Sequence, residues 1–222
     1  MSIEYSISED VYAFTSCRFE SLPFEVTVGH QVHGNAVAVI DMKGMTRDDL
    51  DGFDALITNL PGCAIGVRTA DCIPIFLYDK EHKAIAAIHS GWKGTLQRIV
   101  IKTIAQMHIS YRTDASEIIA LIGPGICRKC FQVGEEVVLA FRDTDFPIGS
   151  IYSWNGPKKQ GDITTGHHID LVEANRWLLL EAGVRPENIS DCGICTYEDG
   201  RLYSARREGQ ECGRNINAIM VL

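Results

Sequence analysis

Short apolar runs dominate the first half of the chain, and their length and flanking residues predict β-strands. Each run is rich in Val, Ile or Ala and is bounded by Gly, Pro, Asn or Asp, as strands commonly are. We expect strands at 35–40, 54–59, 63–68, 73–78 and 83–89. The runs at 73–78 and 83–89 are apolar over almost their whole length, which is typical of strands buried on both faces.

Apolar positions at helical spacing predict three helices in the rest of the chain. The helix expected at 95–110 has one face made of Leu96, Ile99, Val100, Thr103, Ile104 and Met107. A second helix is expected at 134–142, with acidic residues in its first turn. A third is expected between Asp170, a suitable N-cap, and Gly183, which is typical of a helix end.

Further strands at 117–123, 189–195, 201–207 and 215–222 complete the pattern. The strands come in clusters with few helices between them, which indicates an α+β fold rather than a regular alternation of strand and helix. We therefore expect one domain over residues 1–222, with mixed β-sheets covered by helices.

The charge of the chain excludes some classes of function. The chain has 222 residues, 45% of them hydrophobic, and a net charge of −8. It lacks the concentrated Lys and Arg that binding a nucleic-acid backbone requires, although a locally basic pocket for a small anion is compatible with it. The first residues carry no secretory signal, and no run approaches the roughly 20 apolar residues of a membrane span. We expect a cytoplasmic protein that binds neither nucleic acid nor membrane; the sequence leaves its oligomeric state open.

Eight cysteines are present, and in a cytoplasmic protein they favour free thiols or metal ligands over disulfides. Two CxxC pairs stand out, Cys127/Cys130 and Cys192/Cys195. Four such thiolates can hold a structural zinc ion, but the gap between the pairs far exceeds the roughly 15–20 residues usual for such sites. We expect reduced, partly buried thiols and no zinc at these pairs, with a four-thiolate zinc site as the alternative.

Three short motifs carry candidate metal ligands at the ends of predicted strands. They are 30-HQVHG-34 with His33, 69-TADCIP-74 with Cys72, and 89-HSGWKG-94 with His89. Antiparallel pairing of the strands at 73–78 and 83–89 would bring Cys72 and His89 to one sheet edge. Two imidazoles and a thiolate suit Zn²⁺, which in catalytic sites keeps one position open. Taken singly, a histidine is more often a hydrogen-bonded structural residue, and a lone cysteine is more often a small buried hydrophobe.

Together, HQVHG, TADCIP and HSGWKG resemble the three signature segments of the laccase-domain (multicopper polyphenol oxidase) family, which read approximately QVHG, TADCxP and HAGWRG. The resemblance continues, in order, through DALIT, IGPGICRKCFQVGEEV, DLVEANRWLL, CTYEDGRLYSARREG and GRNINAIMVL, and covers nearly everything from residue 30 to the end. Members of this family have been reassigned as zinc-containing purine nucleoside phosphorylases. Their fold is similar to the catalytic domain of cytotoxic necrotising factors, which implies α/β/β/α-type layering here.

The resemblance implies that His33, Cys72 and His89 form a zinc site and are the catalytic residues. It also implies phosphate-dependent cleavage of the N-glycosidic bond of adenosine, inosine, guanosine or S-methyl-5′-thioadenosine. Purine nucleosides and phosphate are therefore the expected partners, and some relatives also deaminate adenosine. Copper, which tops the divalent affinity order, is expected to load only adventitiously in vitro.

Phosphorolysis needs cations that hold phosphate. The cations nearest the matching motifs are Arg68, Lys93, Arg206 and Arg207, and we expect one or two of them to have this role. Asp71 is expected to support a ligand histidine or to contact the ribose.

The chain departs from the family pattern in two places. Residues 14–34 compress a longer region that contains a glycine-rich segment in the family, so we expect substrate contacts from that region to be missing or replaced. Lys93 stands where the family commonly has Arg, which keeps the charge but loses the bidentate geometry of a guanidinium.

Two other enzymatic interpretations are open. A copper-dependent polyphenol oxidase agrees with the older family description, but laccase-type copper clusters need more histidines, arranged in HxH pairs, than the seven present here. A hydrolase with Cys72 as nucleophile and His89 as base is the other. The third donor, His33, favours a metal over a free thiolate.

Overall fold

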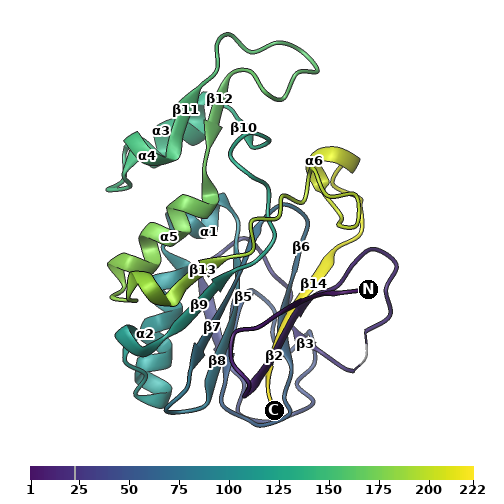
Figure 1. Cartoon of the computed structure of the whole chain (residues 1–222), viewed down its shortest axis with the longest axis vertical. Helices are drawn as coiled ribbons and strands as arrows, with labels where there is room; N and C mark the ends of the chain where they lie inside the picture. The colour runs from purple at the N-terminus through teal and green to yellow at the C-terminus, as the bar shows by residue number, and fades with distance from the viewer. Residues whose placement is uncertain (23) are drawn as a thin grey trace.

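Two β-sheets packed face to face form the centre of the molecule (Figure 1). The computed structural model describes residues 1–22 and 24–222; residue 23, within the compressed 14–34 segment, lies outside the described residues. The larger sheet has the strand order β13-β9-β7-β8-β5-β4. Its strands are β4 (Ala36–Val39), β5 (Phe53–Thr58), β7 (Ile73–Asp79), β8 (Ala84–Ser90), β9 (Ile119–Ile122) and β13 (Ile189–Asp191).

The five-stranded sheet joins both ends of the chain, in the order β1-β2-β14-β6-β3. Its strands are β1 (Ile3–Tyr5), β2 (Val11–Thr15), β3 (Thr27–Val28), β6 (Ile65–Thr69) and β14 (Asn215–Val221). The last strand, β14, lies between β2 and β6 and is antiparallel to both. The C-terminal segment is thereby fixed beside the strand that leads into the TADCIP motif.

Alternate side chains of the six-stranded sheet face two different hydrophobic cores. Ile73, Ile75 and Leu77 of β7 belong to the core that includes the helices, whereas Phe76 and Tyr78 belong to the core between the two sheets. Every residue of β7 and β8 is buried, as predicted for strands covered on both faces. Burial on both faces fixes the register of these strands and therefore the position of the residues at their ends.

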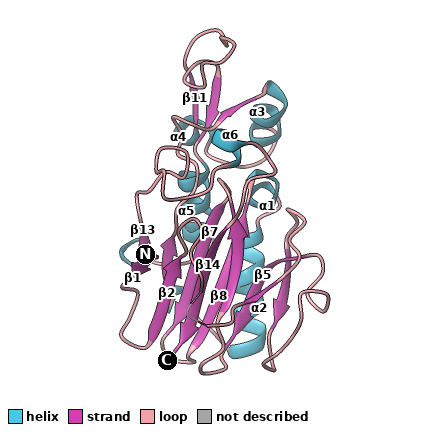
Figure 2. Cartoon of the chain, turned by 90° about the vertical axis from the view of Figure 1, so that its right-hand side faces the viewer, coloured by secondary structure: helices cyan, strands magenta, loops and turns pink. Residues whose placement is uncertain are grey.

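Helices cover the outer face of the six-stranded sheet, along which α2 (Ile99–Tyr111) and α5 (Leu171–Glu181) lie (Figure 2). The other helices are α1 (Trp92–Leu96), α3 (Glu135–Arg142), α4 (Ile148–Ile151) and α6 (Ala205–Glu208), with 3₁₀ turns at Ala115–Glu117 and Pro186–Asn188. In the described ranges no helix lies along the outer face of the five-stranded sheet, so the second helical layer implied by α/β/β/α layering is not found there (Figure 1). None of the helices in this part of the chain has the length and apolarity needed to cross a membrane.

A small antiparallel sheet stands at one end of the molecule together with α3, α4 and α6 (Figure 1). Its strands are β10 (Gln132–Val133), β11 (Tyr152–Trp154) and β12 (His167–Ile169), with β12 in the middle. They are too short for the sequence pattern to predict. The loops that carry the candidate site lie between this end and the two large sheets.

The α+β class with mixed sheets is confirmed, and one expected helix is divided. Asp170 caps α5 as predicted, accepting a hydrogen bond from the backbone N–H of Glu173 at 3.0 Å. The helix expected at 95–110 is instead α1 followed by α2, because Arg98 has a left-handed backbone with φ of 59°. The Arg98 guanidinium lies over the rings of Phe146 and Trp177, which holds the break in place.

The prediction of a strand at 201–207 is wrong. Ser204 instead caps α6, and its side chain accepts a hydrogen bond from the backbone N–H of Arg207 at 3.2 Å. The guanidinium of Arg207 bonds to several backbone carbonyls of the preceding loop. These tertiary contacts outweigh the weak strand pattern of the segment.

Candidate metal centre

The ends of three chain segments bring His33, Cys72 and His89 together. β7 and β8 pair antiparallel with Pro74 opposite His89, so Cys72 and His89 meet at one sheet edge, as predicted. His33 arrives from the loop that precedes β4. The candidate ligand atoms of the three residues lie within 4.8 Å of one another, and the ring centroids of the two histidines are 4.8 Å apart.

A buried carboxylate, that of Asp54, holds both histidines in place. It is 0% exposed and accepts a hydrogen bond from Nδ1 of His89 at 2.7 Å. The same carboxylate accepts hydrogen bonds from the backbone N–H groups of Val32, His33 and Gly34 at 3.1, 3.0 and 2.8 Å. Because Nδ1 of His89 is committed to Asp54, Nε2 is the nitrogen left to bind a metal.

The backbone takes uncommon conformations where the segments meet. His33 has φ of 60° and Asp71 has φ of 94°, values that cost energy unless the surrounding structure holds them, and such residues gather at functional sites. Gly91 leaves the space that the side chains need. A Cβ atom there would lie 3.0 Å from Sγ of Cys72 and 3.1 Å from Cδ2 of His33. A side chain at the first glycine of HSGWKG would therefore crowd both candidate ligands.

Cys72 and His89 change each other's protonation. Burial alone raises the pKa of the Cys72 thiol, but the positive charge of His89 and hydrogen bonds from His33 and His89 lower it to about 6. Burial alone lowers the pKa of His89, but the Cys72 sulfur and the Asp54 carboxylate raise it to about 9. At neutral pH the metal-free group therefore holds a thiolate beside an imidazolium, and the thiolate is the form of cysteine that binds metals.

The donor set fits a zinc ion. Two imidazole nitrogens and one thiolate supply three ligands and leave the fourth tetrahedral position free for water or substrate, as in catalytic zinc sites. His33, Cys72 and His89 all line one large cavity. The free position would therefore face a space that a substrate can enter.

The cavity beside this group has a volume of about 930 Å³. Its walls include the turn between β6 and β7, the segment after β9, α6 and the loop that follows α6. Trp92 and Phe131 contribute aromatic surface to these walls. The volume falls within the range of about 300–1,000 Å³ that is typical of small-molecule sites.

Three arginines, Arg47, Arg68 and Arg214, gather at the cavity. Burial, together with the positive charges of Arg47 and Arg214, lowers the pKa of Arg68. Nε of Arg68 is buried and has no hydrogen-bond partner among the described residues. Within the same residues, none of the three guanidinium groups forms an ion pair with a carboxylate. In an acidic chain, a group of cations without acidic partners indicates an anion-binding site.

Two other predicted residues, Asp71 and Arg206, line the cavity but are bound to other parts of the chain. Asp71 accepts hydrogen bonds from Oγ1 of Thr196 at 2.6 Å and from the backbone N–H of Arg206 at 2.7 Å. The Arg206 guanidinium donates to two backbone carbonyls at 3.1 and 2.9 Å. Asp71 thus ties the turn before β7 to α6, and the support of a ligand histidine comes from Asp54 instead.

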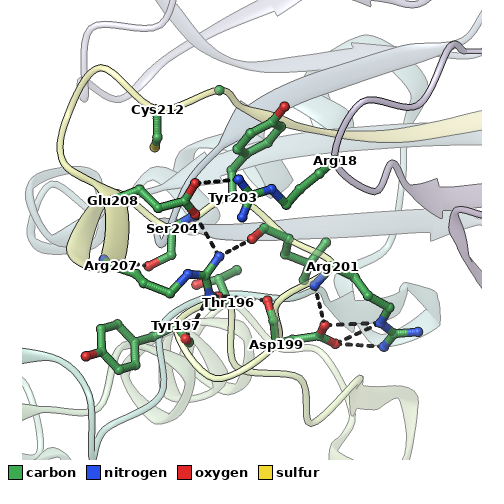
Figure 3. A network of polar contacts seen from close by, with 12 residues as sticks. Arg18, Thr196, Tyr197, Asp199, Arg201, Tyr203, Ser204, Arg207, Glu208 and Cys212 are labelled. Carbon is green, nitrogen blue, oxygen red and sulfur yellow. Dashed lines mark hydrogen bonds and ion pairs between the residues drawn. The ribbon is translucent and has the colours of Figure 1, made fainter.

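The last two predicted cations, Lys93 and Arg207, are not among the residues that line the cavity. Nζ of Lys93 lies 5.6 Å from the centroid of the Trp92 ring. The guanidinium of Arg207 donates to the carbonyls of Thr196 and Tyr197, both at 2.8 Å (Figure 3). Arg207 therefore holds the loop before α6 in shape.

The two CxxC pairs do not assemble four thiols. Cys127, Cys130 and Cys195 come together with Glu198, and their candidate ligand atoms lie within 4.8 Å of one another. Cys192 lies outside this group. The four-thiolate site considered from the sequence is therefore not formed, and a carboxylate takes the place of the fourth thiol.

Asp54, Arg47 and Arg214 are the residues of the site that the sequence pattern did not indicate. Asp54 stands in an apolar strand segment, where a single acid could have been recognised as a buried charge that needs partners. No local signal marks Arg47 or Arg214. They reach the cavity only because of the path that two loops take in the folded chain.

Residues 11–222 match the family model described as multi-copper polyphenol oxidoreductase laccase. A purine nucleoside phosphorylase of Bacteroides thetaiotaomicron is 43% identical over 207 residues, which cover 90% of this chain and 74% of that protein. Adenosine deaminase RL5, from an unknown prokaryotic organism, is 39% identical over 202 residues, with 88% and 74% covered. The crystal structure of the hypothetical protein YfiH of Bacillus licheniformis has a TM-score of 0.81 and 22% identity, over 96% of this chain and 93% of that one. At this low identity the likeness shows a shared fold.

Proposed function

We propose that this chain, which belongs to the family described as multi-copper polyphenol oxidoreductase laccase, is a zinc-dependent purine nucleoside phosphorylase. In the reaction, an oxygen of phosphate forms a bond to C1′ of the ribose while the bond from C1′ to the base nitrogen breaks. The base leaves with the electron pair and takes up a proton. The products are a free purine and a pentose 1-phosphate.

One observation carries the proposal: a single cavity contains both the candidate metal ligands and the arginine group. His33, Cys72 and His89 line it together with Arg47, Arg68 and Arg214. Phosphorolysis requires an anion site and an electrophilic or acid-base group within reach of one bound nucleoside, because reacting groups must be held in contact. A hydrolase acting with water alone has no need of a built anion site.

The arginine group is the proposed phosphate site. The buried Nε of Arg68, which has no partner in the described part of the chain, is a donor that phosphate would satisfy. Arg47 and Arg214 add positive charge beside it. The guanidinium of Arg214 already donates to the backbone carbonyls of Gly213 and Gln210 at 3.1 and 3.0 Å, so it would act through its charge, whereas Arg47 offers a guanidinium that suits the geometry of phosphate oxygens. The aromatic side chains of Trp92 and Phe131 offer flat surfaces on which a purine can pack.

His33, Cys72 and His89 are the proposed zinc ligands. A zinc ion bound to them would supply a Lewis acid at the cavity wall. The chain's own contribution is to hold the ligand atoms: Asp54 fixes the tautomer and orientation of His89 and, through three backbone N–H groups, the loop that carries His33. The thiolate state of Cys72 at neutral pH makes the group ready to bind the metal.

The test is product analysis with and without phosphate. Protein purified without chelators is incubated with inosine or adenosine, and the free base and pentose 1-phosphate are measured by chromatography. Base release that requires phosphate and falls with the zinc content supports the proposal. Equal base release without phosphate, or full activity of metal-free protein, would contradict it.

Adenosine deamination is a second candidate activity, because a relative named adenosine deaminase is 39% identical to this chain. The same cavity and metal group would serve, since both reactions take adenosine. Ammonia and inosine formed from adenosine in the absence of phosphate would reveal this activity. It would be lost with the metal ligands but retained when the arginine group is altered.

A cysteine hydrolase is a third candidate, because Cys72, His89 and Asp54 have the order of a nucleophile, a base and an orienting acid. His33 as a further donor within the same 4.8 Å favours a metal. Alkylation of Cys72 distinguishes a cysteine hydrolase from a zinc enzyme. Zinc should protect Cys72 from alkylation if the thiolate is a ligand, and Cys72→His should keep some zinc, whereas a nucleophile would be inactivated by this change outright.

The family description names copper oxidation of phenols, and the donors in this chain give it little support. The candidate metal groups of residues 1–22 and 24–222 include one with histidines, formed by His33, Cys72 and His89. A cluster of several coppers needs more imidazoles than this group offers. We expect oxidase activity only after copper is added, independent of phosphate.

A further inference from the structure

We propose that Cys127, Cys130, Cys195 and Glu198 form a second zinc site, structural in role and separate from the cavity. One ligand atom from each of the four residues lies within 4.8 Å of the other three, a spacing that small side-chain adjustments can close around a tetrahedral ion. Thiolates are the donors that structural zinc sites prefer, and a carboxylate is an accepted fourth ligand.

The sheet topology explains why these residues meet although they are distant in sequence. β9 and β13 are parallel, with Ile122 opposite Asp191, so the chain leaves both strands at the same edge. The two exit loops remain joined beyond the sheet. Gly125 and Cys195 form a parallel bridge, and the backbone N–H of Thr196 donates to the Gly125 carbonyl at 3.0 Å.

The local backbone is shaped to present sulfur atoms. The N–H of Cys130 donates to the carbonyl of Cys127 at 3.0 Å, which closes the tight CxxC turn and places both thiols on one side. The backbone N–H of Cys127 donates to Sγ of Cys195 at 3.3 Å. Hydrogen bonds to a ligand atom orient it for the metal and stabilise its charged form.

The group is closed off from the cavity. Cys130 is 3% exposed and Cys195 is 9% exposed. They pack with Ile126, and Phe131 and Tyr197 lie against them. The three cysteines are not among the residues that line the cavity. A site with four protein ligands and no access for substrate is typical of structural zinc.

Nearby cations compensate the negative charge that three thiolates and a carboxylate would bring. Nζ of Lys129 lies 3.4 Å from Oε1 of Glu198. The Arg206 guanidinium donates to the carbonyl of Cys130, and Arg207 donates to that of Tyr197. Binding of Zn²⁺ replaces the protons of those cysteines that are still thiols, and these protons pass to solvent, so zinc affinity should rise with pH.

The proposed site has a consequence for the cavity, because the same two loops form part of the cavity wall. Ile126 and Phe131 flank the CxxC pair and line the cavity, and Arg206 bridges this segment to α6. A zinc ion that ties Cys127 and Cys130 to the loop of Cys195 would hold this wall in one conformation. Its loss should loosen the wall without removing any group that contacts the substrate.

The decisive experiment is a zinc count in matched variants. Protein without an affinity tag, purified without chelators, is analysed for zinc by mass spectrometry. We expect about two zinc ions per chain in the wild type, about one in Cys195→Ala and about one in Cys72→Ala. Cys192→Ala is the control, because this cysteine is the other member of the Cys192/Cys195 pair but lies outside the group, and it should keep about two.

Cobalt supplies a second measurement that does not depend on how well Cys195→Ala folds. In Cys72→Ala, which retains the proposed site, Co²⁺ should give tetrahedral d–d bands in the visible range and an intense sulfur-to-cobalt charge-transfer band from three thiolates. In the wild-type protein with only the His33/Cys72/His89 group loaded, the charge-transfer band should have about one third of that intensity, because one thiolate contributes.

Two outcomes would overturn the proposal: a zinc count that is the same in Cys195→Ala as in the wild type, or an intramolecular disulfide between cysteines of this group in freshly purified protein, detected by intact mass. The site is tested independently of the proposed catalytic function. Cys195→Ala that has lost one zinc and still cleaves nucleosides supports this site whatever the fate of Cys72. A wild type with two zinc ions but no phosphorolysis would contradict the proposed function alone.

Discussion

The two groups of candidate metal ligands in this molecule both contain cysteine, but they differ in their access to the cavity and in the groups that hold their ligands in place. The His33/Cys72/His89 group lies on a cavity of about 930 Å³ and is oriented by a buried carboxylate, Asp54. In the Cys127/Cys130/Cys195/Glu198 group, Cys130 and Cys195 are buried among apolar side chains and Cys195 accepts a backbone N–H, while Glu198 closes the group from the exposed side. The comparison teaches that the surroundings of a thiolate, rather than its presence, indicate whether a metal there would act on substrate or hold the fold.

The two groups also arise from opposite kinds of strand pairing. Cys72 and His89 meet because β7 and β8 are antiparallel, so the start of one strand lies beside the end of the other. Cys127 and Cys195 meet because β9 and β13 are parallel, so two strand ends lie side by side. β7 and β8 follow each other in the sequence, so their pairing can be predicted from the sequence. β9 and β13 are far apart in the sequence, so their pairing cannot.

The largest expected effect is a difference in base release between a substitution in the first group of ligands and one in the second. Cys72→Ser should abolish phosphate-dependent base release and lower the zinc content, because a neutral hydroxyl is a poor donor in place of a thiolate. Cys195→Ser should also lose zinc but retain most base release at low temperature, with a lower melting temperature. Chromatography of the base, zinc analysis and thermal unfolding of both variants check this. Equal loss of activity in both would show that the groups do not have distinct roles.

A smaller effect tests the buried carboxylate that distinguishes the first group. Asp54→Asn should weaken metal binding at that group by about 10–100-fold, as the loss of a hydrogen-bonded support commonly does. Zinc competition with a chromogenic chelator measures this. Asp51→Asn is the matched control, because Asp51 also bonds Nδ1 of a histidine, that of His30 at 2.6 Å, but on the exposed surface. An equal loss in both variants would contradict the role given to Asp54.

Substitution in the arginine group should weaken phosphate binding without changing the zinc content of either metal site. Arg68→Gln should raise KM for phosphate about 10–100-fold, because a charged hydrogen bond is worth about 1.5–3 kcal/mol, while the zinc content stays unchanged. Steady-state kinetics with varied phosphate measure this. Arg185→Gln, which alters a surface arginine paired with Glu117, is the control. An unchanged KM in Arg68→Gln would place phosphate elsewhere in the cavity.

Alkylation of metal-free protein should distinguish the thiols by pH. The pKa of Cys72 is lowered to about 6, so its reaction with iodoacetamide should rise through that pH and then level off. Burial raises the pKa of Cys192 to about 11, so this thiol should remain slow up to high pH. Peptide mass spectrometry after timed alkylation checks both sites. A midpoint for Cys72 near the ordinary value of 9 would show that no imidazolium lies beside it.

The smallest effect is on stability. A thiol whose folded pKa is depressed to about 6 contributes stability that is lost as the pH falls through that value, and an imidazole whose folded pKa is raised to about 9 contributes stability that is lost as the pH rises through that value. Between these two pH values the two slopes nearly cancel, because the folded thiolate–imidazolium pair and the unfolded thiol–imidazole pair each hold one proton, so the pair leaves the stability of the metal-free fold almost independent of pH. In Cys72→Ala this cancellation is lost, and the melting temperature should vary with pH by about 2–4 °C for each kcal/mol that the remaining imidazole contributes. Thermal unfolding in chelator across this pH range measures it.

The sequence by itself determined the α+β class, most of the buried strands and the three candidate ligands of the first group. It could do so because burial on both faces leaves continuous apolar runs, as in β7 and β8, and because the turns at the ends of these strands need glycine and proline. Antiparallel neighbours then place Cys72 and His89 at one edge without further information. His33 joined them only through the resemblance of HQVHG, TADCIP and HSGWKG to the signature segments of a known family.

Only the tertiary structure decided which charged groups serve the site. Asp54 supports His89, and Arg47 and Arg214 join Arg68, although no spacing in the sequence relates them. It also decided that Glu198 rather than Cys192 completes the second group. The physical reason is that these contacts depend on where loops go after they leave the sheets, and a loop's path is set by distant hydrogen bonds and packing rather than by the local pattern of apolar residues.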